Sequence, residues 1–157
     1  MMSEQCLCGS GLSYQLCCEP YHLGDKHAEN AEKLMRSRYC AYVKHDISYI
    51  VQTTVPAQQQ KLNQQDMREW SETTDWQKLE VIAFKQKVSK IHAQVEFKAY
   101  FNHQGELKHH HELSTFTNIE GKWYFLDPTV EMTTTMKQPC ICGSNKKFKQ
   151  CCAAFLV

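Results

Sequence analysis

Apolar side chains recur along the chain with two different periods, and the first of them predicts a long helix. Between residues 28 and 46, apolar and aromatic positions return at intervals of three and four, as on one face of an amphipathic helix. These positions are Ala31, Leu34, Met35, Tyr39, Tyr42 and Val43. Such a helix needs a second layer against which to bury its apolar face.

The second period, alternation of apolar and polar residues, predicts strands in the later part of the chain. β-branched and aromatic residues are frequent in four segments, residues 79–88, 91–101, 107–119 and 123–126. Segments 102–105 and 118–121 contain the asparagine and glycine of hairpin turns, so the sheet should be antiparallel. We therefore expect an α+β fold in which the long helix packs on a curved antiparallel sheet, like a cone with an open mouth.

The polar segment between the helix and the sheet is harder to interpret. Residues 56–75 are rich in glutamine and lack glycine, and Asp66 could cap a short helix that reaches Trp70.

Composition and charge limit the classes of protein to consider. The chain has 157 residues, 42% of them hydrophobic, and 18 basic against 17 acidic residues for a net charge of +1. These values predict one folded domain with small additions and do not favour bulk electrostatic binding of nucleic acid or anionic membranes. No apolar run approaches the roughly 18 residues of a membrane helix, and the first residues do not resemble an export signal. We expect a cytoplasmic protein without membrane insertion.

Cysteine is the unusual feature, because eight of the nine cysteines lie in two matching groups at the ends. Each group reads C-x-C-G-S, then six residues, then C-C. The two groups are Cys6, Cys8, Cys17 and Cys18, and Cys140, Cys142, Cys151 and Cys152. Four thiolates are the usual closed shell of a structural Zn²⁺ site, so we predict two zinc ions per chain. Redox-active adjacent thiols, or small buried hydrophobic residues, are the alternatives.

The groups divide the chain into three predicted parts, residues 1–24, 25–136 and 137–157. Glycine and serine after the first cysteine pair allow a tight turn beneath the metal and bring amide groups toward the sulfurs. Adjacent cysteines cannot point at one metal from an ideal strand, so a helical turn is expected at each C-C pair.

C-x-C-G-S with a distal C-C resembles the SEC-C motif, the zinc module at the C-terminus of the SecA translocation ATPase. The segment LMRSRYCAY (residues 34–42), between two such motifs, resembles the YchJ-like family of uncharacterised bacterial proteins. That resemblance covers nearly the whole chain and implies a middle domain like nuclear transport factor 2, also described as cystatin-like. Asn145 stands where the family commonly has a second glycine, and asparagine tolerates the left-handed backbone.

Helix geometry selects a candidate pocket inside the cone. On a helical wheel Arg38 shares the apolar face with Tyr42, so its guanidinium should be at least partly buried and require a partner. Asp127, on the same side of the last strand as Trp123, is the preferred partner, and Glu112 is the other. A structural ion pair or a side chain reaching toward solvent is the simpler interpretation, and recognition of an anionic ligand is the sharper one.

Other candidates for chemistry are weaker. In the run from His109 to His111 only the two outer rings could share a metal, and a solvated strand is favoured. Cys40 is predicted to lie opposite the apolar face, with no histidine tied to it. Acid–base work by Asp127 or His92 is possible, but phosphate-loop, dinucleotide and zinc-protease patterns are absent from the sequence. No catalytic residue is assigned.

The two end groups differ in charge. Residues 1–24 have two acidic residues and no lysine or arginine, whereas residues 137–152 have four lysines and no acidic residue. The lysines could simply offset the charge of a zinc tetrathiolate, or Lys146, Lys147, Phe148 and Lys149 could bind a partner, as the SecA module is understood to contact its chaperone partner and the ribosome.

These observations favour a non-enzymatic, zinc-stabilised adaptor whose partners are proteins more than nucleic acid. The competing function is binding or catalysis on a small anionic molecule in the cone, and disulfide oxidoreduction is third.

Overall fold

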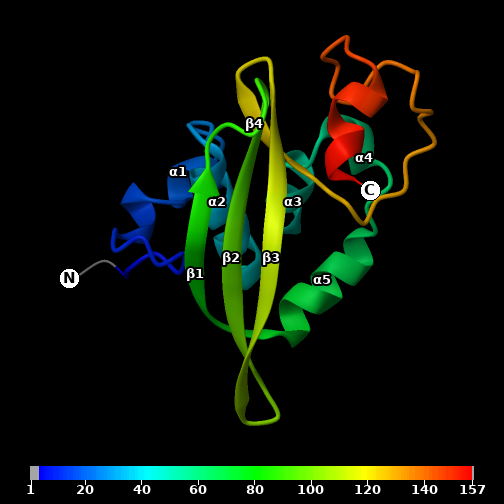
Figure 1. Cartoon of the computed structure of the whole chain (residues 1–157). Coiled ribbons are helices and arrows are strands. Elements are labelled where there is room, and N and C mark those ends of the chain that lie inside the picture. Colours follow the sequence, from blue (N-terminus) through cyan, green and yellow to red (C-terminus); the bar gives the residue numbers. More distant parts are fainter. Residues whose placement is uncertain (1–3, 157) are drawn as a thin grey trace.

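The computed structural model describes residues 4–156, in which a four-stranded antiparallel sheet curves around a central helix (Figure 1). The strands follow the chain order across the sheet. Their bounds are β1 Asp75–Lys85, β2 His92–His103, β3 Glu106–Ile119 and β4 Lys122–Leu126. All four predicted strands are therefore confirmed, and so is the α+β fold class.

Two hairpin turns and two irregularities give the sheet its shape. Gln104 and Gly105 have φ of 51° and 81°, and Glu120 and Gly121 have 53° and 87°. Positive φ at both central residues is typical of turns that match strand twist. The register of β1 on β2 shifts between Trp76 and Lys78 and between Val81 and Ala83. Such bulges increase twist and bend the strand, which helps to make the sheet concave.

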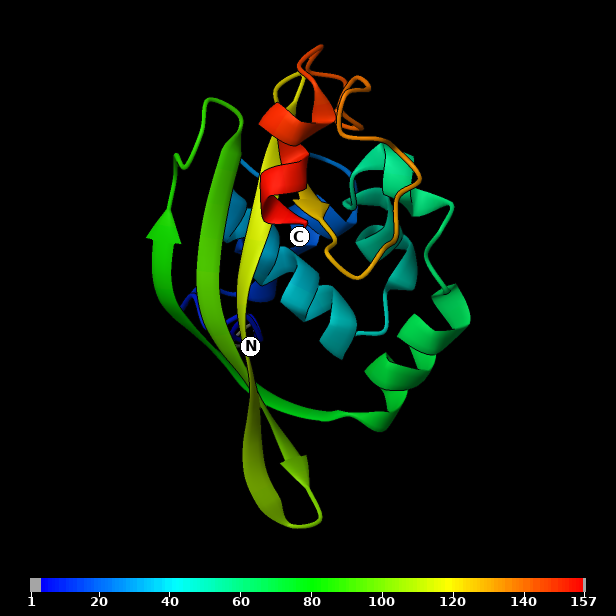
Figure 2. The ribbon, with the colours of Figure 1, turned by 45° about the vertical axis from the view of Figure 1, so that its right-hand side comes forward.

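The predicted long helix is α2, Ala31–Val43, which lies on the concave side of the sheet (Figure 2). Its N-cap is Asn30, whose side chain accepts the backbone N–H of Lys33, so the helix starts three residues later than the pattern suggested. It ends before His45, whose φ of 63° breaks the helix. Leu34, Met35 and Tyr39 are buried in the same core as Val95 and Phe97 of β2.

Three short helices lie between α2 and the sheet in sequence. They are α3 Ile47–Gln52, α4 Pro56–Gln59 and α5 Gln64–Thr73. The predicted capping of α5 by Asp66 is wrong. Asn63 is the N-cap, and its side-chain oxygen accepts the backbone N–H of Asp66. An N-cap bonds the amide two or three residues ahead, so the acid belongs to the first turn and not to the cap.

The ends form small modules at two separate places on the central domain (Figures 1 and 2). The N-terminal module contains a 3₁₀ turn, Tyr14–Leu16, and α1, Glu19–His22. The C-terminal module contains two 3₁₀ turns, Phe148–Gln150 and Cys152–Phe155. The 3₁₀ turns and α1 flank each adjacent cysteine pair, as expected.

The two modules join the hydrophobic interior differently. Cys6, Cys8 and Cys18 belong to the main core with α2, whereas the C-terminal cysteines form a second cluster with Val55 and Leu126. The predicted boundary near residue 24 therefore does not separate two cores. The outer limits at residues 1 and 157 lie outside the described residues. Within the described chain, no helix has the length and apolarity needed to cross a bilayer.

Candidate metal centres and the central pocket

The N-terminal module brings four thiols to one point. The Sγ atoms of Cys6, Cys8, Cys17 and Cys18 all lie within 4.8 Å of one another. Cys8 and Cys17 Sγ are 3.5 Å apart, and Cys17 and Cys18 Sγ are 3.8 Å apart. A hydrogen bond from the Cys6 N–H to the Leu12 carbonyl, 2.7 Å long, closes the turn after the first cysteine pair. Within this turn Gly9 has a positive φ of 81°.

The C-terminal module repeats this construction. Its four Sγ atoms also lie within 4.8 Å of one another, with Cys142 and Cys151 3.6 Å apart. The Cys140 N–H donates to the Lys146 carbonyl at 2.8 Å, which is the equivalent closing bond. Asn145 has a φ of 70° where Gly11 has 87°, so the expected left-handed turn is confirmed. The sequence repeat is therefore a repeat of backbone structure as well.

Both thiol groups fit a tetrahedral metal ion. A metal–sulfur distance of about 2.3 Å places tetrahedral sulfurs about 3.8 Å apart, close to the separations observed. All nine cysteines are free of disulfides. Burial raises the pKa of Cys17 and that of Cys151 to about 11 each, since a buried thiolate is disfavoured without a nearby cation. A bound metal would supply that cation and hold the thiols deprotonated.

Cys40 is a fifth thiol beside the N-terminal group. It is fully buried, and its Sγ is 4.0 Å from Cys6 Sγ. The wheel correctly placed it away from the sheet, but that side of α2 is covered by the N-terminal module. Arg36 on the same side donates from Nη1 to the Cys8 carbonyl at 2.7 Å, and His22 Nε2 is 2.8 Å from the Ser37 carbonyl oxygen. These contacts attach the module to the helix.

His92 has the corresponding place beside the C-terminal group. Its Nε2 is 3.3 Å from Cys152 Sγ, and the residue is 1% exposed. Ser89 Oγ accepts the backbone N–H groups of Ile91 and His92, each at 3.1 Å, and lies 2.7 Å from His92 Nδ1. With both lone pairs of Ser89 in use, its hydroxyl proton goes to Nδ1, so the ring hydrogen is on Nε2 and points at sulfur.

That arrangement corrects the interpretation of His92 as an acid–base candidate in the cone. Burial lowers the pKa of the ring, in keeping with the neutral form. The sequence held no signal for this role, because the histidine and the cysteine are 60 positions apart.

Arg38 is buried, as predicted, at 7% exposure. Its Nη1 donates to the Ile50 carbonyl at 2.9 Å and to the hydroxyls of Thr53 at 2.7 Å and Thr54 at 3.4 Å. The guanidinium carbon lies 4.6 Å from the centre of the Phe125 ring.

The predicted ion pair between Arg38 and Asp127 is absent from the described residues. Asp127 Oδ1 instead accepts the N–H and hydroxyl of Thr129, at 2.8 and 2.6 Å. Glu112, the alternative partner, accepts the hydroxyl of Ser114 at 2.7 Å. The acceptors that hold Arg38 come from α3 and the residues just after it, a helix that the sequence analysis did not predict.

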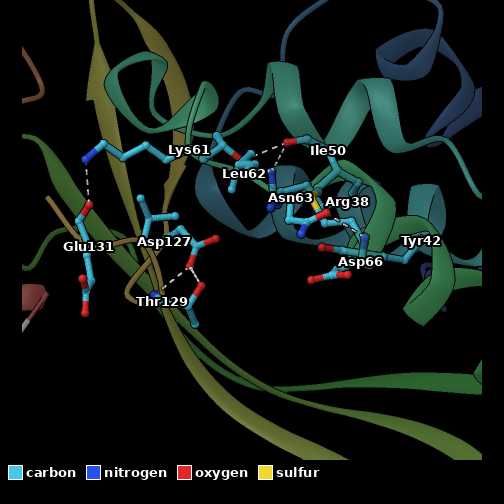
Figure 3. Close-up of a pocket in the computed structure, with 13 residues that line it drawn as sticks. Arg38, Tyr42, Ile50, Lys61, Leu62, Asn63, Asp66, Asp127, Thr129 and Glu131 are labelled. Carbon is cyan, nitrogen blue, oxygen red and sulfur yellow. Dashed lines mark hydrogen bonds between the residues drawn. The ribbon is translucent and has the colours of Figure 1, made fainter.

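Two adjoining cavities open beside Arg38. The outer one, drawn in Figure 3, has a volume of about 500 Å³, and the inner one has about 290 Å³. Both are lined by Arg38, Tyr42, Asp127 and Thr129. These residues include three of the four candidate pocket residues. The fourth, Trp123, lines a different cavity with His22 and Tyr49, so its assignment to this pocket is wrong. It shares the strand face of Phe125 but lies two residues earlier in β4, beside the N-terminal module.

The histidine run does not form a metal group in the described part of the chain. His111 Nε2 lies 2.7 Å from a carboxylate oxygen of Glu96 on the neighbouring strand. His110, on the opposite strand face, lines the inner cavity.

The exposed surfaces of the two end modules differ. Lys146, Lys147 and Lys149 are exposed, but Phe148 is 5% exposed in the C-terminal core, so the expectation that it contacts a partner is wrong. Phe148 stands between exposed lysines in the sequence because its side chain is buried and theirs are not. The N-terminal module exposes leucines that the sequence analysis did not single out: Leu7 at 46%, Leu12 at 51%, Leu16 at 73% and Leu23 at 67%.

Comparison with family models agrees with both resemblances. The model described as the YchJ middle NTF2-like domain matches residues 30–128, and the SEC-C motif matches residues 2–20 and 136–154.

Relatives and solved structures extend the similarity to full length. A UPF0225 protein of Actinobacillus succinogenes is 49% identical over 155 residues, covering 99% of this chain and 100% of its own. One from Geobacter sulfurreducens is 39% identical, covering 98% and 100%. The crystal structure of a SEC-C motif containing protein from Psychrobacter arcticus has a TM-score of 0.93 at 48% identity, covering 99% and 97%. The solution structure of a SEC-C motif containing protein from Rhodopseudomonas palustris has a TM-score of 0.73 at 38% identity, covering 80% and 96%.

Proposed function

The chain belongs to the UPF0225 family, with a YchJ-type middle domain between two SEC-C motifs, and we propose that it is a cytoplasmic, non-enzymatic adaptor stabilised by two Zn²⁺ ions. Each ion would be held by four thiolates. A shell of four protein sulfurs leaves no position for water or substrate, which is the arrangement of a structural and not of a catalytic zinc site.

The observation that carries the adaptor proposal is the difference between two modules built alike. The closing hydrogen bonds place Leu12 and Lys146 at equivalent positions, and the same alignment pairs Leu16 with Gln150. Buried ligands are repeated while exposed residues diverge. One module therefore offers an apolar surface and the other a basic one, as expected if each metal core supports a different contact.

Protein partners suit these surfaces better than nucleic acid does. Exposed leucines gain little from a phosphate backbone, and four lysines provide at most a few phosphate contacts. Acidic protein surfaces fit the lysines, and apolar protein surfaces fit the leucines.

Metal analysis tests the first half of the proposal. Freshly purified protein should contain two zinc ions per chain by elemental analysis, and all nine cysteines should titrate as thiols when the protein is denatured with a chelator and without a reductant. Less than one zinc per chain would contradict the proposal.

The adaptor half is tested by comparing proteins co-purified with tagged wild type and with surface variants. Leu12→Ser with Leu16→Ser should lose one set of partners, and Lys146→Glu with Lys147→Glu another. Lys108→Glu, exposed on the sheet, serves as the charge control. Recovery of the same proteins by all folded variants would contradict a role for the modules in binding.

A further inference from the structure

Arg38 is held on one side and free on the other. Its three acceptors all bond to Nη1. Within residues 4–156, Nη2 and Nε have no hydrogen-bond acceptor, and Arg38 lines both cavities. A buried guanidinium without a carboxylate partner is costly unless something else compensates its charge. The fixed Nη1 and the ring of Phe125 keep the free edge in one orientation, so an anionic group would meet a preorganised donor.

The other charges around the cavities restrict what that anionic group can belong to. Asp127 and Asp66 line the outer cavity with Glu131, and Glu112 lines the inner one. Against these four carboxylates stand Arg38 and Lys61, whose Nζ already donates to the Glu131 carbonyl at 3.1 Å. The wall is therefore negative overall. A ligand with only negative charge would be repelled by most of it, and a ligand with only positive charge would leave Arg38 uncompensated.

The inner cavity adds a preference for an aromatic or aliphatic body. Trp70, Trp76, Phe97 and Phe116 contribute to its walls, and its volume of about 290 Å³ is near the lower end for small-molecule sites. The Trp70 and Trp76 rings meet edge to face at 5.2 Å. Trp76 Nε1 is a buried donor without a partner in the described chain, and because the indole ring lines the inner cavity its N–H reports a change there.

From these observations we propose that the cone binds a small zwitterion of amino-acid type with an apolar side chain. The carboxylate meets the free edge of Arg38, the ammonium group lies toward Asp127, and the apolar body enters the inner cavity. Figure 3 shows Arg38 and Asp127 on different walls of the outer cavity, and the charged end of such a molecule is placed between them. This inference is independent of the adaptor proposal, because it concerns no residue of the end modules.

Three probes separate the parts of the proposal on the wild-type, zinc-loaded protein. L-Phenylalanine carries both charges, 3-phenylpropionate lacks the ammonium group, and phenethylamine lacks the carboxylate. Calorimetric titration should give binding of L-phenylalanine and at least about tenfold weaker binding of the other two, since each loses a hydrogen-bonded charge pair. Two-dimensional NMR should show shifts at Arg38 Nε–H and Trp76 Nε1–H, and not at Trp123, which lines another cavity.

Substitutions then assign the charges. Asp127→Asn keeps the oxygen that accepts from Thr129. It should weaken the binding of L-phenylalanine about tenfold and leave the binding of 3-phenylpropionate unchanged. Arg38→Met should weaken the binding of both molecules. Arg68→Gln, an exposed arginine of α5 outside both cavities, is the control and should alter neither.

Every result decides for or against the zwitterion. Equal affinity for L-phenylalanine and 3-phenylpropionate would overturn the role of Asp127, and tighter binding of phenethylamine would overturn that of Arg38. No binding of any probe at 10 mM, roughly the weakest affinity worth assigning to a specific site, would overturn the whole proposal. If Arg38→Met does not fold, absence of a shift at Arg38 Nε–H in the wild-type titration would have the same effect.

Discussion

Three nearby side chains of α2 contact two different parts of the protein. Arg36 and Cys40 both meet the N-terminal module, at the Cys8 carbonyl and at Cys6, whereas Arg38 reaches the cone. Successive residues of a helix project at different angles, so a helix covered on several sides can hold a different neighbour at each position. The role of each residue of α2 therefore depends on which layer covers its side of the helix.

At the residue scale, His92 should support the second metal centre from outside its ligand set. An N–H donor to a thiolate lowers the charge on sulfur and orients it, and loss of such a contact typically costs 10- to 100-fold in metal affinity. His92→Phe should therefore release the C-terminal ion about 10- to 100-fold more readily, with the N-terminal ion unchanged. Competition with a chromophoric chelator measures this.

His103→Asn is the matched control, because His103 is exposed at the other end of β2. If His92→Phe releases the C-terminal ion no more readily than the wild type does, the contact with Cys152 contributes nothing to metal binding.

Arg38→Met should destabilise the fold only moderately. Thr54 Oγ1 still donates to the Ile50 carbonyl at 2.9 Å, and no carboxylate loses a contact partner. We expect a loss of about 1–2 kcal/mol in the free energy of unfolding, the size of a lost hydrogen-bond set with compensation. Urea denaturation at equilibrium, with Arg68→Met as control, measures it. A loss of about 3–5 kcal/mol would indicate that Arg38 compensates a buried carboxylate after all.

At the scale of elements, α2 connects the sheet to the N-terminal module. The Arg36 side chain is 21% exposed and also contacts Glu32 at 3.3 Å, so it is oriented before it reaches the Cys8 carbonyl. The module also contacts charged side chains of the central domain through Tyr21, whose hydroxyl donates to Glu29 at 2.6 Å, and through the ring of Tyr14, 4.2 Å from Lys44 Nζ. The Arg36 bond is therefore one of several attachment points, and it is the one that reaches the backbone between the cysteines.

Removing that attachment should loosen one module and not the other. Arg36→Ala should raise amide hydrogen exchange in residues 4–24 by roughly tenfold, which corresponds to a lost charge-assisted bond in a partly exposed place. Exchange in residues 137–156 should be unchanged. Arg68→Ala controls for loss of an exposed arginine, and a uniform rise in exchange across the chain would contradict a local role.

At the scale of the whole molecule, the two proposed metal centres differ in which part of the fold surrounds them. The N-terminal cysteines lie in the main core, and the C-terminal cysteines lie in a separate cluster at the end of the sheet. A structural metal contributes its binding energy to the fold around it, so the two ions should stabilise different parts of the protein.

Matched substitutions should reveal this asymmetry. Cys6→Ser with Cys8→Ser should lower the unfolding temperature of the central domain by several degrees, since a loss of about 1 kcal/mol shifts it by about 2–8 °C for domains of this size range. Cys140→Ser with Cys142→Ser should disorder the C-terminal module and leave that temperature nearly unchanged. Tryptophan fluorescence reports the central domain, and hydrogen exchange reports each module. Identical melting of the two variants would contradict the assignment of separate cores.

Sequence alone determined the long helix, the four strands and the two cysteine clusters, because each depends on chemistry that is local in the chain. The spacing of apolar residues predicted α2 and all four strands, and turn residues predicted the hairpins. The repeated C-x-C-G-S and C-C predicted two clusters of four thiols, since the ligands of each cluster lie within one short loop.

Only the tertiary structure decided which distant groups meet. Cys40 and Cys6 are 34 positions apart, and His92 and Cys152 are 60 apart. Arg38 was correctly predicted to be buried, yet its partners come from α3 and the loop after it and not from Asp127, because the nearest acceptors depend on where a short, weakly patterned helix packs. The burial of Phe148 and the exposure of Leu12 and Leu16 likewise depend on how the end modules pack against the central domain. Periodicity predicts whether a side chain is directed inward or outward, and only the packing of the elements decides which groups it contacts.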